Sequence, residues 1–224
     1  MLGAMTTDIT VRGQAHDTRD PDRAVLTIVV RAEARDWAEA HVGVSSAIAT
    51  LNDSIAALQA TQPDALERFN IGQTFQTSWT VKGGQKFVEM AHVTMRFIDF
   101  SAMSIWAFGN TSEAVQIQGI SWELSPRVRD AVRTELGKAA VQDARDRATT
   151  FAAAAGLKIV AVQALADPGL LTGGQHGGMG DQIYAAVPRG MAFAASGAIS
   201  DQVIDLTPEP IETTSLVEAH FLAE

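Results

Sequence analysis

The sequence contains no cysteine, and its 224 residues include only 17 lysines and arginines against 26 aspartates and glutamates. The lack of cysteine excludes disulfide bonds and every metal site that depends on thiolate ligands. The formal net charge of −9 argues against nucleic acid as a partner, because phosphate binding needs a clustered basic surface. Composition therefore favours a protein that binds neither nucleic acid nor a thiolate-ligated metal.

Long uninterrupted apolar runs are also missing. The most apolar late segment, IYAAVPRGMAFAASGAI, is short and is broken by Pro188 and Arg189, so no membrane span is expected. The N-terminal MLGAMTTDIT has neither the basic start nor the apolar core of a secretory signal. We therefore expect a cytoplasmic protein in which residues 1–7 are an N-terminal extension or an expression remnant.

Hydrophobic periodicity predicts ten secondary-structure elements. Alternating apolar residues indicate strands, and apolar residues three and four positions apart indicate helices. The predicted strands are residues 8–15, 24–33, 66–81, 86–98, 115–124, 157–165 and 211–224, and the predicted helices are residues 37–58, 101–108 and 126–155. The segment DTRDPDR, between the first two strands, is predicted to be a turn.

Local signals support the ends of several elements. Asp36 is a plausible N-cap residue for the first helix, and Ser125 with Pro126 opens the longest one. The KGGQ turn joins two strands as a hairpin, and Gly119 marks a switch of strand phase where a β-bulge is expected. The longest helix carries an alanine-rich apolar stripe: Val128, Val132, Leu136, Ala140, Ala144, Ala148, Phe151 and Ala155.

The order of these elements predicts an α+β fold. Hairpins flank the helices, so the helices are expected to pack on a mostly antiparallel sheet. We predict a single domain over residues 8–224, with one long loop insertion, residues 167–200, before the last strand.

The glycine-rich stretch GGQHGGMG, residues 173–180, is interpreted as a connecting loop. A phosphate-binding loop needs Lys and Ser or Thr where Met179 and Gly180 stand. His176 would need two or three further ligands to hold a metal. No two histidines have ligand spacing in the chain; they are His16, His41, His92, His176 and His220.

Hydrolytic chemistry is not indicated either. Ser121, in GISWE, lies within a predicted strand and lacks the second glycine of a nucleophile elbow. The clustered carboxylates are interpreted as a solvated turn and a solvated helix face: Asp17, Asp20 and Asp22, then Asp143 and Asp146. We therefore predict no catalytic, cofactor-binding or metal-binding residue, and a protein that is not an enzyme.

The segment GISWELSPRVRDAVRTELGKAAVQDARDRATTFAAAAGLKIVAVQAL resembles the hallmark of the SIMPL-domain family, which includes periplasmic immunogenic proteins and an oxidative-stress-defence protein. In the opening strand, Val11 and Gly13 match the pattern I-x-V-x-G, and Pro210-Ile211 precedes a similar closing strand. The helix motif is matched by Ala140, Asp143, Ala144, Arg145, Arg147, Ala148, Gly156 and Leu157.

The resemblance implies an α+β fold that assembles into large ring-like homo-oligomers, with no established catalytic residue and no cofactor. It also suggests a role in stress protection through self-assembly or binding of a protein partner. Two alternatives stay open. The first is a small-molecule binder or hydrolase with a pocket under residues 167–200, marked by a polar cluster around His176. The second is a signalling adaptor, marked by an exposed apolar patch without a pocket.

Overall fold

The computed structural model describes residues 6–82, 84–171 and 207–224. They form two compact units. Unit 1 holds the described residues of Met1–Asp20, Leu124–Val187 and Pro210–Glu224, and unit 2 holds those of Pro21–Glu123 and Pro188–Glu209. The predicted glycine loop with His176, and most of the predicted insertion, lie outside the described residues. That residues 8–224 act as one domain stays a prediction.

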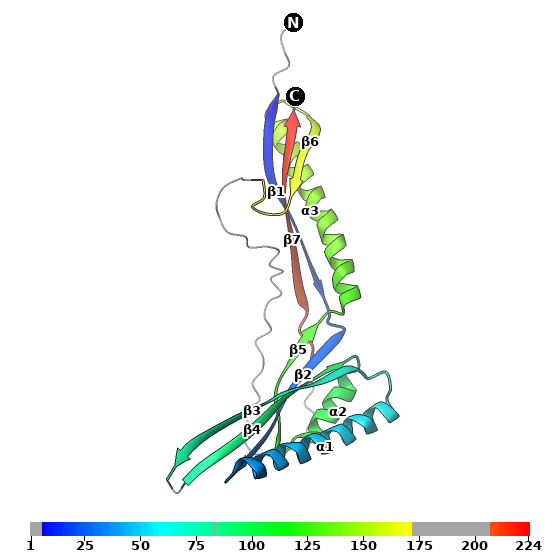
Figure 1. Ribbon diagram of the computed structural model, residues 1–224. Coiled ribbons are helices and arrows are strands. Elements are labelled where there is room, and N and C mark those ends of the chain that lie inside the picture. The colour runs from blue at the N-terminus through cyan, green and yellow to red at the C-terminus, as the bar shows by residue number, and fades with distance from the viewer. Residues whose placement is uncertain (1–5, 83, 172–206) are drawn as a thin grey trace. The chain divides into compact units, whose positions relative to one another are not determined.

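Unit 1 is one helix on a three-stranded antiparallel sheet (Figure 1). The strand order is β1 (Thr7–Arg19), β7 (Ile211–Ala223) and β6 (Ile159–Ala166), and α3 (Pro126–Ala154) runs along one face. β1 and β7 pair without interruption, from Thr7 opposite Ala223 to Arg19 opposite Ile211. The predicted turn DTRDPDR is therefore largely strand, because β1 continues along β7 as far as Arg19.

An alanine stripe brings α3 close to this sheet. The buried residues of α3 recur at every fourth position: Val132, Leu136, Ala140, Ala144, Ala148 and Ala152. Ala144 and Ala148 pack in one cluster with Val11, Ala219 and Phe221. Two predicted members of the stripe, Phe151 and Ala155, are exposed, because the four-residue spacing continues to Ala152 instead.

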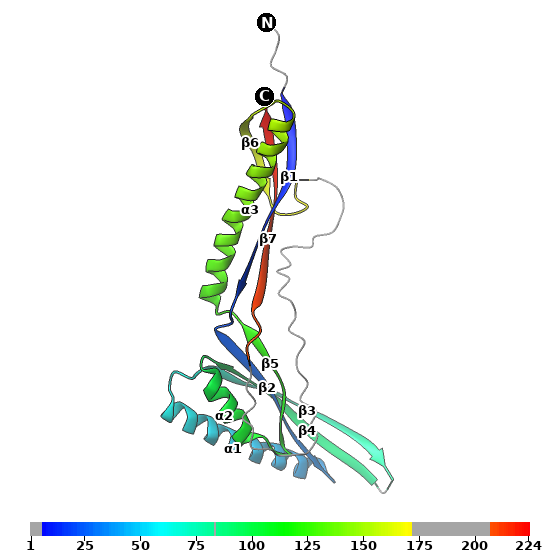
Figure 2. The same cartoon turned by 180° about the vertical axis from the view of Figure 1, so that it is seen from behind.

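Unit 2 is a four-stranded antiparallel sheet with two helices (Figure 2). The strand order is β3 (Leu66–Val81), β4 (Gly84–Phe97), β2 (Arg23–Ala34) and β5 (Val115–Glu123). Both helices, α1 (Trp37–Thr61) and α2 (Phe100–Asn110), pack on β2 and β4. The core between the helices and the sheet is built from fully buried side chains, among them Leu26, Ile28, Val93, Met95, Phe97 and Met103.

Three register shifts interrupt the ladders of the unit 2 sheet. Thr27 pairs with Gly119 and Ile28 with Ile117, so Gln118 is an extra residue beside the glycine where the bulge is predicted. The other two lie in β3, between Leu66 and Arg68 and between Ile71 and Thr74, and the sequence analysis anticipated neither. Each shift changes which side chains face the helices.

The α+β class and the order of elements are confirmed. Asp36 caps α1 as predicted, since its Oδ1 accepts a hydrogen bond from the Glu39 amide at 2.8 Å. Ser125 and Pro126 stand at the N-cap and first turn of α3. The strands form two mostly antiparallel sheets. The sequence analysis did not predict this division, because side-chain periodicity indicates which face of a strand is buried but not which strand it pairs with. Among the described residues, no helix is both long and apolar enough to cross a bilayer.

Candidate functional site

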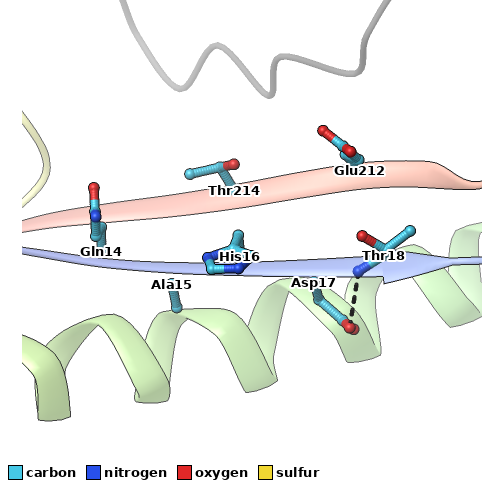
Figure 3. Close-up of a pocket in the computed structure, with 7 residues that line it drawn as sticks. All are labelled: Gln14, Ala15, His16, Asp17, Thr18, Glu212 and Thr214. Atoms are coloured by element: carbon cyan, nitrogen blue, oxygen red, sulfur yellow. Dashed lines mark hydrogen bonds between the residues drawn. The ribbon is translucent and has the colours of Figure 1, made fainter.

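The open face of the β1–β7 ladder in unit 1 carries a hollow of about 340 Å³ (Figure 3). Successive side chains of a strand leave opposite faces, and Figure 3 shows Asp17 pointing toward α3 while Glu212 points away from it. The two carboxylates therefore do not converge as an acid–base pair would need to. The lining residues are Gln14, Ala15, His16, Asp17, Thr18, Glu212 and Thr214.

Asp17 is already engaged by its neighbours. Its Oδ2 accepts a hydrogen bond from Arg19 Nε at 2.6 Å, and its Oδ1 accepts one from the Thr18 amide at 2.9 Å. The hydrogen bond from Arg19 is the main reason why the pKa of Asp17 lies below its ordinary value. A carboxylate held ionised in this way is a poor general acid near neutral pH.

A second charged pair lies on the other face of the ladder, away from α3. Arg12 Nη2 contacts Glu218 Oε1 at 2.9 Å, and the Glu218 side chain is largely buried whereas that of Arg12 is exposed. The hydrogen bond from Arg12 lowers the pKa of Glu218 against the opposing effect of burial, and the backbones of Gly169 and Leu171 act in the same direction as Arg12. The pair thus links β1 to β7, which is a structural role.

The most buried charged group in the described residues is Glu89, on β4 of unit 2, with no exposed surface. Its Oε1 lies 3.0 Å from Nδ1 of His41 on α1, and its Oε2 accepts a hydrogen bond from Gln76 Nε2 on β3 at 2.8 Å. Three elements therefore meet at one carboxylate. The His41 side chain is 62% exposed, so the cluster reaches the surface through the imidazole.

The environment of Glu89 favours its ionised form. Burial is the largest single effect and acts to raise the pKa, but the hydrogen bonds from His41 and Gln76 and the charge of His41 outweigh it. The pKa of Glu89 therefore lies below its ordinary value of 4.5. Because folding lowers this pKa, the cluster stabilises the fold above about pH 4.5 and loses that contribution as the pH falls through the folded pKa.

We expect His41→Ala to destabilise unit 2 by about 1–2 kcal/mol at pH 7, at the lower end for hydrogen bonds to charged groups because the imidazole is exposed. The variant should also begin to unfold at a higher pH than the wild type, since Gln76 alone would then oppose the effect of burial on Glu89. Tryptophan fluorescence reports the unfolding of unit 2, because all four tryptophans lie in that unit. Urea unfolding measures the loss of stability, and acid unfolding with the same signal measures the shift in pH.

His92→Ala is the matched control, because His92 is an exposed histidine on the same strand as Glu89. It should leave both the urea midpoint and the acid transition near their wild-type values. Equal effects of the two substitutions would contradict a specific role of the His41–Glu89 contact.

Each of the four described histidines has a different neighbour within its own unit. His16 lines the hollow, His41 contacts Glu89, His92 lies edge-on to the ring of Phe75, and His220 Nε2 lies 3.6 Å from Asp8 Oδ1. His176 lies outside the described residues. Within the described residues, no three histidine, aspartate or glutamate side chains are grouped as metal ligands.

Two polar contacts were missed by the sequence analysis. Asp143, predicted to lie on a solvated helix face, accepts a hydrogen bond from the backbone amide of Gln14 at 2.9 Å and so links α3 to β1. Glu89 was not singled out, although a signal for it exists. It occupies the inward phase of β4 together with Ala91, Val93 and Met95, and a charged residue in an apolar phase indicates a buried partner.

In the comparison with family models, almost the whole chain matches one family. Residues 9–221 match the SIMPL model, described as a protein of unknown function (DUF541). No curated protein matches the chain significantly. The matched span includes the Gly13 strand and the alanine stripe of α3, two features on which the resemblance rests. The chain therefore belongs to the SIMPL family.

Proposed function

We propose that this SIMPL protein acts by homo-oligomeric assembly and is not an enzyme. One observation carries the proposal: each sheet ends in a strand that exposes large apolar side chains. The exposed fractions lie between 38% and 55% for Phe69, Phe75 and Trp79 on β3 and for Val160, Val162 and Leu165 on β6.

An exposed edge strand presents unpaired backbone N–H and C=O groups, so it is a template for pairing with another chain. Monomeric proteins commonly protect such edges with charged residues or proline. β6, with the sequence IVAVQALA, contains neither. Burial of these edges in an assembly would remove their apolar surface from water, which supports self-association.

The geometry of the charged groups supports the non-enzymatic part of the proposal. The two carboxylates of the hollow point to opposite sides of the sheet, and Asp17 is paired with Arg19. Glu89 and Glu218 are likewise engaged in structural contacts.

Native mass spectrometry of the protein purified from its own cells tests the proposal. We expect a species whose mass is an integer multiple of 23.8 kDa, and it should persist on dilution into the low micromolar range. A monomer at every concentration would overturn self-assembly. A complex with a different protein in place of the homo-oligomer would favour the signalling-adaptor alternative, and a stoichiometric small molecule would favour the binder or hydrolase.

Stress protection is the biological setting that the family resemblance suggests, and we include it in the proposal. Cells that lack the protein should survive oxidant exposure less well than cells that carry it. A variant that folds but does not assemble should fail to restore survival, whereas full rescue by that variant would separate protection from assembly.

A further inference from the structure

One edge strand of unit 2 has no charged residue for most of its length. β3 is an edge strand of the described sheet: it pairs with β4, and no other described strand pairs with it (Figure 1). Between Arg68 and Lys82 there is no Asp, Glu, Lys, Arg or Pro. Every residue from Gln73 to Thr80 is exposed, including the aromatic rings of Phe75 and Trp79.

The register with β4 places both rings on one face of the sheet. Phe75 is opposite Met90, Thr77 is opposite Val88, and Trp79 is opposite Lys86. The intervening Gln76 is opposite Glu89 and contacts it, so it shares the face that α1 covers. Phe75, Thr77 and Trp79 therefore lie on the face away from the helices.

The sequence of this segment is nearly the same in both directions. Residues 74–80 read T-F-Q-T-S-W-T: a central threonine, then on each side a polar residue, an aromatic residue and a threonine. In an antiparallel pair of identical strands centred on Thr77, each residue faces its mirror position in the other chain. Phe75 would then face Trp79 of the second copy, Gln76 would face Ser78, and Thr74 would face Thr80.

We propose that β3 is a self-recognition surface on which a second copy of this chain adds its own β3, antiparallel and centred on Thr77. The proposal rests on the self-assembly proposed above and names the surface that makes one contact of the assembly. Such a contact is isologous, because the same residues serve both subunits. It joins two four-stranded sheets into one continuous sheet.

The pairing that results is favourable on both faces. Two aromatic cross-strand pairs form on the face away from the helices, with one Thr–Thr pair between them. On the other face, glutamine, serine and threonine side chains can hydrogen-bond across the axis. No like charges meet within the seven paired residues.

The other edge strands are less suited to this role. β1 carries Asp8, Arg12, Asp17 and Arg19 along its length, which is how natural edges are protected from pairing. β5 contains the bulge beside Gly119, which interrupts a regular ladder. The sequence of β6, IVAVQALA, has no comparable symmetry.

Thr77→Lys tests the surface by placing two lysines opposite each other at the axis. We expect association through this contact to weaken by at least about tenfold, seen as a shift to smaller species in sedimentation velocity. Thr10→Lys is the matched control, since Thr10 is an exposed threonine on the edge strand of the other sheet. It should assemble like the wild type, and far-UV circular dichroism should show both variants folded.

Thr77→Cys tests the register without adding charge. The natural chain has no cysteine, so mild oxidation of this variant can cross-link only residue 77 to its copy. Opposed cross-strand Cβ atoms lie near the spacing that a disulfide needs, so a covalent dimer is expected. Thr10→Cys should give little cross-link under the same conditions.

The outcomes separate the two proposals. A wild-type assembly that Thr77→Lys leaves intact, or that oxidation of Thr77→Cys does not cross-link, would overturn the β3 surface but leave self-assembly standing. A wild-type protein that stays monomeric would overturn self-assembly, and the β3 surface with it. Cross-linking at residue 77 with loss of association in Thr77→Lys would support both.

Discussion

Gly13→Ala is expected to destabilise unit 1 by about 3 kcal/mol or more, at the upper end of the range for overpacked cores. A Cβ atom at residue 13 would lie 2.0 Å from the carbonyl oxygen of Ala140, 2.7 Å from the amide nitrogen of Ala144 and 2.8 Å from the Ala144 Cβ. Two of these three atoms are backbone, so no side-chain rotation relieves the overlap. α3 would have to move away from β1, which would open the alanine interface.

Gly137→Ala is the matched control for this substitution. Gly137 lies within α3, and a Cβ atom added there meets nothing within 4 Å. Alanine in a helix interior is favoured over glycine, so this variant should gain up to about 1 kcal/mol. The same change thus has opposite signs at two glycines of unit 1.

Thermal unfolding followed by far-UV circular dichroism detects the loss of α3 in unit 1 together with that of α1 and α2 in unit 2. Tryptophan fluorescence reports unit 2 in the same samples. We expect part of the dichroism transition of Gly13→Ala to move to lower temperature, while the fluorescence transition stays near the wild type. Equal stability of the Gly13→Ala and Gly137→Ala proteins would contradict the close approach of α3 to β1.

Phe97→Ala is expected to destabilise unit 2 by about 3–5 kcal/mol, the usual range for removing a buried aromatic side chain. Phe97 has no exposed surface, and its ring lies 6.2 Å from that of Trp106 on α2. The substitution removes a buried ring that lies against Trp106 of α2, and it should leave a cavity between that helix and β4. Tryptophan fluorescence during urea unfolding should show a lower midpoint, with Trp106 itself as a local reporter.

Phe75→Ala makes the same chemical change at an exposed ring on the neighbouring strand. Phe75 is 55% exposed, so its removal should change the free energy of unfolding of the monomer by no more than about 0.5 kcal/mol. The pair distinguishes a phenylalanine that supports the core from one that the β3 proposal assigns to association. Similar midpoints for the two variants would show that the core of unit 2 does not depend on Phe97.

Local sequence signals predicted most of the elements of this fold. Capping at Asp36 and the bulge beside Gly119 depend on residues near each other in the chain, so they can be read directly. The bulge in β3 was missed because Gly72 and Gln73 interrupt the strand without an obvious change of apolar phase. The division into two sheets depends on pairing partners far apart in the chain, which periodicity does not specify.

The polar contacts were harder to predict than the elements. The Glu89 cluster joins residues from α1, β3 and β4, and only the folded register places Gln76 opposite Glu89. Asp143 has the sequence context of a solvated residue of α3, but in the structure its carboxylate accepts a hydrogen bond from the Gln14 amide. In each case the residue type was visible in the sequence, but its partner was supplied by another element.

The strand order of unit 1 also governs when this protein can fold during synthesis. β7 is the middle strand of the β1–β7–β6 sheet, so neither β1 nor β6 has its neighbour until β7 has left the ribosome. Arg12 and its partner Glu218 are 206 residues apart, and all of β2 to β5 is made in the interval. Unit 2 can therefore complete its sheet co-translationally, whereas β1 has no strand to pair with until β7 has been made.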